Sequence, residues 1–191
     1  MTLRTPDVIK SKNKLGAILR PRGANYSIEM ENTSGVSIED LKIVDCQGGI
    51  NIINSHNCTM KGNDIIYKNK PGIYIDGSYY NQIIDNFIDP DKDYRAFGIQ
   101  LVNSAYNNII DNSIHSNLYI LAFDEVSNNN LIEGKFNGLV FDTEKGLNCS
   151  VSCTSSNNIL HCERHQENRG DCPDCRTCAI IGQKNNWLCI K

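Results

Sequence analysis

Short apolar segments return at a regular interval along most of the chain, each time with the same polar neighbours. Residues 72–75 (GIYI) precede 81–88 (NQIIDNFI), and the same order returns in 98–101 (GIQL) and 107–114 (NNIIDNSI). Within these segments apolar positions alternate with other positions, and a period of two is typical of β-strands. The pattern therefore predicts short strands, joined by polar bends, that repeat about every 19 to 26 residues.

Four columns of equivalent positions define this repeat. The first contains only Gly and Asn, at Asn25, Gly49, Gly72, Gly98, Asn117 and Gly138. Because Gly and Asn enter the left-handed region at low cost, we expect a bend of positive φ at the start of each repeat. The other three columns are apolar: Tyr26, Ile50, Ile73, Ile99, Leu118 and Leu139; Ile38, Met60, Ile83, Ile109 and Leu131; and Ile43, Ile65, Ile88, Ile114 and Phe136. Three apolar columns predict three strands per turn around one shared interior.

Two polar columns keep the same register. Asn63, Asn86 and Asn112 would stack one strand spacing apart, about 4.8 Å, where their amides can hydrogen-bond to one another; the alternative is solvated bends. The column beside them is acidic, at Asp40, Asp85, Asp111 and Glu133. Stacked carboxylates repel one another, so this column predicts either a ladder that binds Ca²⁺ or another cation, or bends exposed to solvent.

The repeat resembles the parallel β-helix repeat of the pectin-lyase-like superfamily, including its NosD-type repeat families. The resemblance implies an all-β, right-handed, single-stranded parallel β-helix, here of about six to seven short rungs with a Cys-rich C-terminal loop. We predict an N-terminal cap at 1–24, regular rungs at 25–146, and Cys-rich terminal rungs at 147–191 with a lateral loop at 161–177. The superfamily includes lyases, hydrolases, epimerases and phage tailspikes, so the resemblance implies a fold and no particular reaction.

Length and charge narrow the classes of partner. The chain has 191 residues and a net charge of −3, which fits one domain and gives no basic surface for nucleic acid. No apolar run approaches the roughly 18 residues of a membrane span, and no signal peptide begins at Met1. We therefore expect a cytoplasmic or virion-associated protein, unless the chain is a trimmed piece of a longer one.

Cysteines gather near the C-terminus, where seven of the nine lie in the last 43 residues. Their spacing, together with one histidine, predicts a structural Zn²⁺ site made from Cys162, His165, Cys172, Cys175 and Cys178. The alternative is a disulfide-stapled end in which Cys149 or Cys153 pairs with a later cysteine. Because the count is odd, at least one cysteine is left as a free thiol, a metal ligand or half of an intermolecular bridge.

An acidic insertion lengthens one rung and is the candidate catalytic loop. Asp89, Asp91 and Asp93 could share a Ca²⁺ ion while Arg95 faces a sugar acid, in a loop that faintly resembles those of β-helix polysaccharide enzymes. The loop departs from the epimerase motif DPH[DE], because Asp91 stands where that motif has His. The paired Asp, GHG and RIK motifs of polygalacturonase-like hydrolases are absent, and a solvated turn is the alternative.

Outward-facing aromatic residues are the candidate ligand-binding surface. Tyr74 and Tyr119 alternate with inward apolar residues, and we expect Gln100 to lie between them on one sheet face. Such tyrosines can stack on sugar rings or be buried by a partner; ordinary surface tyrosines are the alternative.

Three functions follow from these features. The first is a non-catalytic β-helix scaffold, a structural or glycan-binding module of a surface or virion-type assembly, with a polysaccharide or protein partner and with homo-oligomers among the expected forms. The second is a polysaccharide lyase or epimerase that acts on uronate-containing glycans. The third is a metal-dependent interaction protein that uses the Cys-rich loop.

Overall fold

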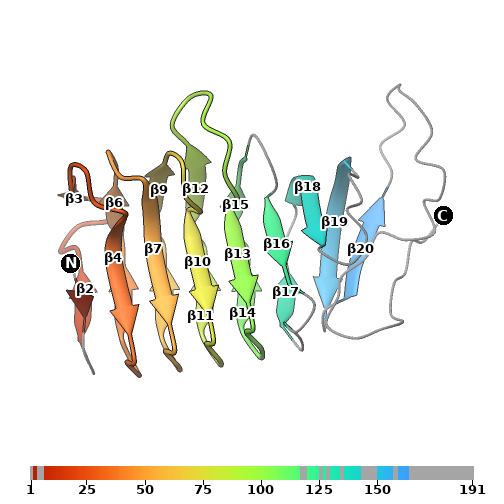
Figure 1. Ribbon diagram of the computed structural model, residues 1–191, viewed down its shortest axis with the longest axis horizontal. Coiled ribbons are helices and arrows are strands. Elements are labelled where there is room, and N and C mark those ends of the chain that lie inside the picture. The colour runs from red at the N-terminus through yellow and green to blue at the C-terminus, as the bar shows by residue number, and fades with distance from the viewer. Residues whose placement is uncertain are drawn as a thin grey trace.

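Strands form every regular element in the part of the chain that the computed structural model describes, which comprises residues 2–3, 7–116, 120–124, 127, 130–133, 136–142, 150–156 and 159–163. The strands lie side by side in stacked rungs along one axis (Figure 1). Within the same residues, no helical segment has the length and apolar character that a membrane span requires.

Three sheets line the coil. The first sheet contains, in spatial order, β1 (Thr2–Leu3), β4 (Tyr26–Glu31), β7 (Gly48–Ile53), β10 (Ile73–Asp76), β13 (Ile99–Val102), β16 (Leu121–Phe123), β18 (Phe136–Asp142), β19 (Ser150–Ser156) and β20 (Ile159–Glu163). The second contains β2 (Val8–Lys10), β5 (Ser37–Glu39), β8 (Thr59–Lys61), β11 (Gln82–Ile84), β14 (Asn108–Ile110) and β17 (Leu131–Glu133). The third contains β3 (Ala17–Leu19), β6 (Leu41–Ile43), β9 (Asp64–Tyr67), β12 (Phe87–Pro90) and β15 (Ser113–Ile114).

The chain visits the three sheets in turn, and each strand pairs parallel with the equivalent strand of the next rung. β4–β6, β7–β9, β10–β12 and β13–β15 make four successive turns of this kind. The predicted all-β parallel β-helix is therefore confirmed.

The N-terminal end of the coil continues the parallel pairing of these turns, whereas the C-terminal end does not. Residues of the predicted N-terminal cap supply β1, β2 and β3, which pair parallel with β4, β5 and β6. At the other end β18 pairs antiparallel with β19, and β19 pairs antiparallel with β20. The described residues from 150 onward thus form a hairpin and not a further parallel rung. The division of the chain into a cap, regular rungs and terminal rungs at residues 24 and 146 stays a prediction.

The predicted apolar columns are stacked in the interior. Ile50, Ile73 and Ile99 are successive partners in the first sheet and are fully buried. The columns Ile38, Met60, Ile83 and Ile109, and Ile43, Ile65, Ile88 and Ile114, are confirmed in the second and third sheets. These stacks of β-branched side chains remove a continuous apolar surface from water, which is the main stabilising contribution to the fold.

The column ends were predicted in the wrong register. Ile28 takes the place predicted for Tyr26, because it pairs with Ile50 while Tyr26 pairs with Gly48. The partner of Ile99 is Leu121 and not Leu118, followed by Val140 and not Leu139, and the partner of Ile109 is Ile132 and not Leu131. Bends of unequal length cause these shifts, since a change of a few residues in a bend moves the whole following strand.

The predicted positive φ at Gly49, Gly72 and Gly98 is also wrong, because none of these glycines has one. A Cβ at each position would overlap the Cγ2 atom of the isoleucine across the interior, and at Gly98 that atom belongs to Ile114. It would also meet the backbone carbonyl of the next rung, for example Gly72 O in the case of Gly49. Glycine is therefore required here by close packing between the first and third sheets.

Apart from single positions at Leu15, Gly23, Asp45 and Lys92, the left-handed bends of the described residues lie in three other columns, whose members are Asn, Asp, Gly and, at two positions, Tyr. They are Asn32, Asn54, Gly77 and Asn103; Gly35, Asn57, Tyr80 and Tyr106; and Asp40, Gly62, Asp85 and Asp111. The acidic column is thus a column of bends, in which Gly62 meets the same backbone requirement as Asp85. Glu133 does not belong to it, because Glu133 pairs with Ile110.

The asparagine ladder is confirmed and is buried. Asn63 Nδ2 donates to Asn86 Oδ1 at 2.9 Å, and Asn86 Nδ2 donates to Asn112 Oδ1 at 2.9 Å. Each amide also bonds the backbone of another rung, as Asn86 Nδ2 does with Met60 O at 2.9 Å. These bonds satisfy the polar backbone groups that the bends remove from water.

Two further ladders, one of asparagines and one of serines, follow the first sheet and were not predicted from the sequence. Asn81, Asn107 and Asn130 repeat the same amide bonds at 3.0 Å. Beside them, the hydroxyls of Ser78, Ser104 and Ser127 accept the backbone N–H of the preceding rung, at 3.0 to 3.1 Å.

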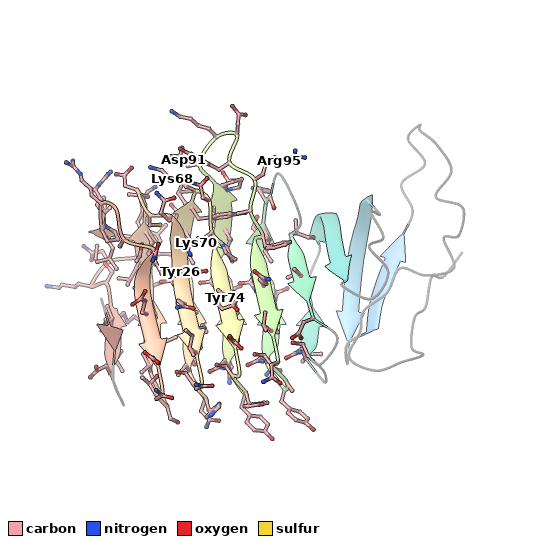
Figure 2. The ribbon with its side chains drawn as sticks, in the orientation of Figure 1. Tyr26, Lys68, Lys70, Tyr74, Asp91 and Arg95 are labelled. Atoms are coloured by element: carbon pink, nitrogen blue, oxygen red, sulfur yellow. The ribbon has the colours of Figure 1, made fainter. Side chains whose placement is uncertain are left out.

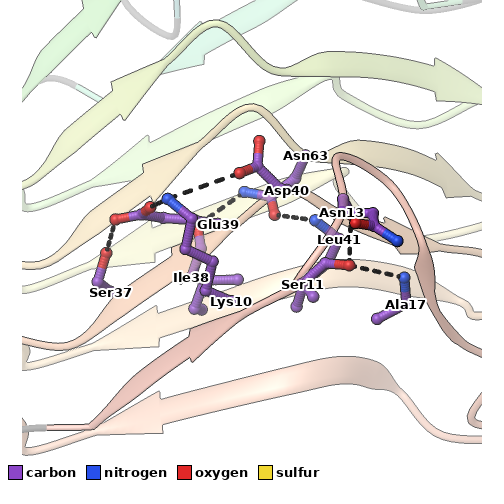
Figure 3. A network of polar contacts seen from close by, with 10 residues as sticks. All are labelled: Lys10, Ser11, Asn13, Ala17, Ser37, Ile38, Glu39, Asp40, Leu41 and Asn63. Carbon is purple, nitrogen blue, oxygen red and sulfur yellow. Dashed lines mark hydrogen bonds and ion pairs between the residues drawn. The ribbon is translucent and has the colours of Figure 1, made fainter.

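The first rung is attached to the second by a polar network at its bend (Figure 3). Lys10 Nζ lies 2.5 Å from Glu39 and 3.7 Å from Asp40. Ser11 Oγ donates to Asn13 O at 2.5 Å and accepts the Ala17 N–H at 3.0 Å. Since Lys10 is more than half exposed, its ion pairs contribute little, and the first rung depends on its backbone pairing.

Tyr67 should make the stability of the coil sensitive to alkaline pH. Its ring is fully buried and its hydroxyl donates to His115 O at 3.1 Å. Burial raises the pKa of Tyr67, the charge of Asp89 adds to this, and a hydrogen bond with Ser116 opposes it. Above about pH 10 the unfolded phenol ionises while the folded one keeps its proton, so Tyr67 alone should lower the unfolding free energy by about 1.4 kcal/mol per pH unit. Tyr26, whose pKa is also raised by burial, adds to this slope.

Urea denaturation followed by circular dichroism between about pH 9 and pH 11 measures this slope. Tyr67→Phe should make the slope shallower, whereas an unchanged slope would mean that Tyr67 does not carry the effect.

Candidate functional site

A groove of about 450 Å³ lies on the outer face of the first sheet. Its lining residues come from β4, β7, β10 and β13 and from the bends that flank them, and they are Tyr26, Asn51, Asn69, Lys70, Pro71, Tyr74, Arg95, Ala96, Phe97 and Gln100. Figure 2 shows Tyr26 and Tyr74 over the sheet, with Lys70 beside them and Arg95 on the extended bend that follows β12.

Two tyrosines make the aromatic part of the groove. The rings of Tyr26 and Tyr74 are stacked, with their centroids 6.4 Å apart and their planes at 29°. Tyr26 lies against Gly48, its partner in β7, where a Cβ would overlap the ring. The glycine therefore lets the Tyr26 ring pack flat on the sheet toward Tyr74.

Amide side chains complete the sheet side of the groove. Asn51 and Gln100 are the two neighbours of Tyr74 in the parallel register, so the three side chains lie in one row. The Oδ1 atom of Asn51 is buried and has no hydrogen-bond partner. A buried acceptor without a donor is unfavourable, so this oxygen is the one buried polar atom of the row whose hydrogen bonding is incomplete.

Two cationic side chains border the groove. Lys70 Nζ lies 5.6 Å from the centroid of the Tyr26 ring, within the range of a cation–π interaction. The Lys70 bend is held on the sheet by Gln47, whose backbone O accepts the Lys70 N–H at 3.0 Å. Arg95 is the second cation, and the ten lining residues include no Asp, Glu or His. The groove therefore favours an anionic ligand.

Both tyrosines remain hydrogen-bond donors over the ordinary pH range. Burial raises the pKa of Tyr26, and the neighbouring Tyr74 and Glu29 raise it further. Burial also raises the pKa of Tyr74, with further contributions from the charge of Asp76 and from its hydrogen bond to the Tyr74 hydroxyl at 3.3 Å. Their hydroxyls thus stay neutral beside a negatively charged ligand.

The predicted catalytic loop is divided between separate contacts. Asp89 Oδ1 lies 3.3 Å from His115 Nδ1, and Asp91 Oδ2 lies 3.8 Å from Lys68 Nζ. Asp93 is exposed, and of the four predicted residues only Arg95 lines the groove. Among the described residues no three His, Cys, Asp or Glu side chains gather in a way that could hold a metal ion. The predicted shared Ca²⁺ site therefore has no support in this part of the chain.

The predicted ligand-binding face is brought together in part. Tyr74 and Gln100 are direct partners in β10 and β13, and both line the groove. Tyr119 lies outside the described residues, and the position beside Gln100 in β16 belongs to Ala122. Tyr26 was not predicted as a groove residue, because the sequence pattern placed it in an interior column. Lys70 was not predicted either, because the sequence of a charged bend does not indicate which sheet face the bend covers.

Most of the predicted zinc site lies outside the described residues, namely His165, Cys172, Cys175 and Cys178. Cys162 is in β20, where its backbone partner in the antiparallel pair is Cys153 of β19. Directly opposed Cα atoms in such a pair are about 4.5 to 5.5 Å apart, which is within the range of a disulfide. The register is therefore compatible with the disulfide alternative, and the zinc site stays a prediction.

The comparisons with known proteins agree with the repeat. The sequence model of the family described as Periplasmic copper-binding protein (NosD) matches residues 7–166. No curated protein and no solved structure gives a significant match. The family match covers well over half of the chain and includes all the stacked rungs described above, and it agrees with the predicted NosD-type resemblance. The chain therefore belongs to the NosD family.

Proposed function

We propose that this chain is a non-catalytic β-helix module that binds an acidic glycan in the groove on the outer face of the first sheet. The observation that carries the proposal is the combination of a stacked tyrosine pair with two bordering cations, in a groove without a carboxylate. β-Helix scaffolds are rigid, so the groove is formed before the ligand arrives and little ordering energy is lost on binding.

Each part of the groove matches one part of a uronate-containing chain. The faces of Tyr26 and Tyr74 suit the apolar faces of sugar rings, Lys70 and Arg95 suit the carboxylates, and the amides of Asn51 and Gln100 suit the hydroxyls. The net charge of −3 would disfavour an anionic ligand over most of the surface, so the two local cations favour binding at this position.

The composition of the groove supports binding rather than turnover. Lyases and epimerases need a base or acid beside the sugar and a way to neutralise the uronate, and several use a metal ion for the second task. Here Asp89 contacts His115, Asp91 is in an ion pair with Lys68, and neither carboxylate lines the groove. The lyase or epimerase remains the alternative function, and the experiment below tests the lyase.

The family name refers to copper, and the described residues do not fit a copper site. Copper in proteins is held by imidazole, thiolate and thioether ligands. Cys46 and Cys58 are single buried thiols, and no cluster of three His, Cys, Asp or Glu side chains occurs in the described part of the chain. We therefore assign no copper chemistry to the groove.

Titration calorimetry with hexagalacturonate tests the proposal. The protein should bind, and Tyr74→Ala should weaken the affinity about tenfold, because one aromatic stacking contact is worth about 1 to 1.5 kcal/mol. Lys70→Gln should also weaken binding and should reduce its dependence on salt concentration, since one charge contact is lost. Lys61→Gln, an exposed lysine on the outer face of β8, is the matched control and should leave the affinity unchanged.

Absence of binding by the wild-type chain, or equal losses in Lys70→Gln and Lys61→Gln, would contradict the groove as the site. Absorbance of an unsaturated product during the same incubation would show that the chain is a lyase, and the non-catalytic assignment would then be wrong.

A further inference from the structure

Two tyrosines occupy bend positions that suit smaller residues. Tyr80 and Tyr106 have φ values of 60° and 58°, in a column whose earlier members are Gly35 and Asn57. The left-handed region is strained for a bulky side chain, and Asn or Gly would adopt it at lower cost. Backbone strain of this kind is concentrated at functional sites, where a residue is kept for binding or catalysis and not for folding stability.

Burial does not compensate for this strain. Tyr80 is 56% exposed and Tyr106 is 47% exposed, which places both among the most exposed large side chains of the described residues. Their rings are stacked on each other, with centroids 5.2 Å apart and an interplanar angle of 16°. The pair is thus a flat aromatic surface that spans two rungs and is presented to solvent.

The bend residues themselves are polar and uncharged, and the carboxylate that touches them, Asp124 Oδ2 at 2.8 Å from Asn103 N, would repel an acidic ligand. The equivalent bends of three successive rungs, 54–57 (NSHN), 77–80 (GSYY) and 103–106 (NSAY), contain no Asp, Glu, Lys or Arg. Asn57 and Asn103 are exposed and offer amide groups beside the rings. The rings of His56 and Tyr79 are tilted, with centroids 5.3 Å apart, and His56 Nδ1 accepts the Tyr79 N–H at 3.1 Å, so the neutral imidazole carries its proton on Nε2.

This aromatic surface is separate from the groove. The bends after β10 and β13 lie at the lower edge of the coil in Figure 1, at the ends of the strands whose outer face carries the groove. No residue from these bends lines the groove.

We propose that Tyr80 and Tyr106, with the amides of Asn57 and Asn103, form a second binding site that takes an uncharged glycan chain. Stacking supplies the contact with sugar faces, and the amides supply hydrogen bonds to hydroxyls, in a surrounding that has no charge to match an acidic ligand. Rungs are about 4.8 Å apart, so the platform is elongated along the coil axis and suits a linear chain. The site is independent of the acidic-glycan function proposed for the groove.

Affinity electrophoresis in gels containing hydroxyethylcellulose or glucomannan tests the site. The wild-type chain should be retarded by at least one of these neutral polymers. The double substitution Tyr80→Asn and Tyr106→Asn should reduce the retardation at least tenfold, while the denaturation midpoint rises because Asn relieves the bend strain. The double substitution Tyr80→Phe and Tyr106→Phe keeps the rings and should keep most of the retardation.

Two results would overturn the proposal. A wild-type chain that neither polymer retards, or an Asn double variant that is retarded as strongly as the wild type, would show that this surface binds no neutral glycan. A lowered denaturation midpoint in the Asn variant would show that the stacked rings serve folding. Hexagalacturonate binding by the Asn variant should remain at the wild-type level, which separates failure of this site from failure of the groove.

Discussion

Replacing Asn86 by Leu is expected to lower the free energy of unfolding by about 4 kcal/mol. The side chain of Asn86 accepts from Asn63 N at 3.0 Å and from Asn63 Nδ2 at 2.9 Å, and it donates to Met60 O and to Asn112 Oδ1. Leucine has a similar volume but makes none of these four bonds. Asn63 N loses its acceptor, at about 1 to 3 kcal/mol for a buried donor, whereas Asn63 Nδ2 keeps Ile38 O and Asn112 Oδ1 keeps the backbone N–H of residue 86.

Urea denaturation followed by circular dichroism measures the loss. Asn108→Leu is the matched control, because Asn108 lies on the outer face of β14 and is only partly buried. It should change the free energy by less than about 0.5 kcal/mol. Similar losses in the two variants would show that the ladder contributes no more than a surface amide does.

Substitution of Gly72 by Ala is expected to destabilise the fold by about 2 to 4 kcal/mol, although alanine is the smallest possible addition. The new Cβ would overlap Ile88 Cγ2, and it would lie 2.8 Å from Gly98 O and 3.0 Å from Tyr67 Cδ1. The carbonyl belongs to a hydrogen-bonded rung and cannot move without disturbing the stacked pairing. The first and third sheets would therefore be forced apart at this rung.

Gly23→Ala is the control that separates packing from backbone conformation. Gly23 has a φ of +80° and no atom within 4 Å of the added Cβ, so its substitution should cost only the backbone strain, about 1 kcal/mol. Thermal denaturation of both variants compares the two effects. If Gly72→Ala costs no more than Gly23→Ala, close packing is not the reason for the glycine column.

The repeat made the fold predictable, but the bends limited the register. Ile73 and Ile99 are identical in type and are followed by the same Asn-x-Ile pattern, so their stacking could be read from the sequence. The predicted positions of Tyr26 and Leu118 in the interior column were wrong, because each residue was aligned by its apolar character across a bend of different length. Leu121, the true partner of Ile99, lies three residues beyond Leu118. Only coordinates establish where a strand begins after such a bend.

The glycine column shows a different limit. Gly49, Gly72 and Gly98 were correctly grouped, but Asn25 was wrongly added to them, because the pairing of Tyr26 with Gly48 places Ser27 opposite Gly49. Glycine is also used for two distinct reasons in this chain. Gly62 and Gly77 have φ values of +66° and +56° and provide bends, whereas Gly72 provides space for Ile88. A single sequence cannot separate these reasons, because both remove the Cβ.

The groove was predictable only where it follows the strands. Tyr74 and Gln100 were placed correctly, since strand alternation determines which residues face outward. Lys70 and Arg95 reach the groove from bends, and Arg95 was chosen for its acidic neighbours rather than for its actual position. The serine ladder could have been found in the sequence. Ser78 and Ser104 each lie three residues before the Asn of the repeated Asn-x-Ile pattern, and Ser55 lies three residues before Cys58, which takes the place of that Asn.

The amide ladder has a direction. Asn63 and Asn86 each donate an Nδ2 hydrogen to the asparagine of the next rung toward the C-terminus. Each asparagine of the ladder therefore needs a later rung that accepts from its Nδ2 and an earlier rung that donates to its Oδ1. At Asn112, the last member of the row in the third sheet, Nδ2 bonds instead to Ile110 O at 3.1 Å. Gene duplication can therefore lengthen such a coil only when it copies whole turns, because each copied turn then has its asparagine at the ladder position. A partial copy would interrupt both asparagine ladders.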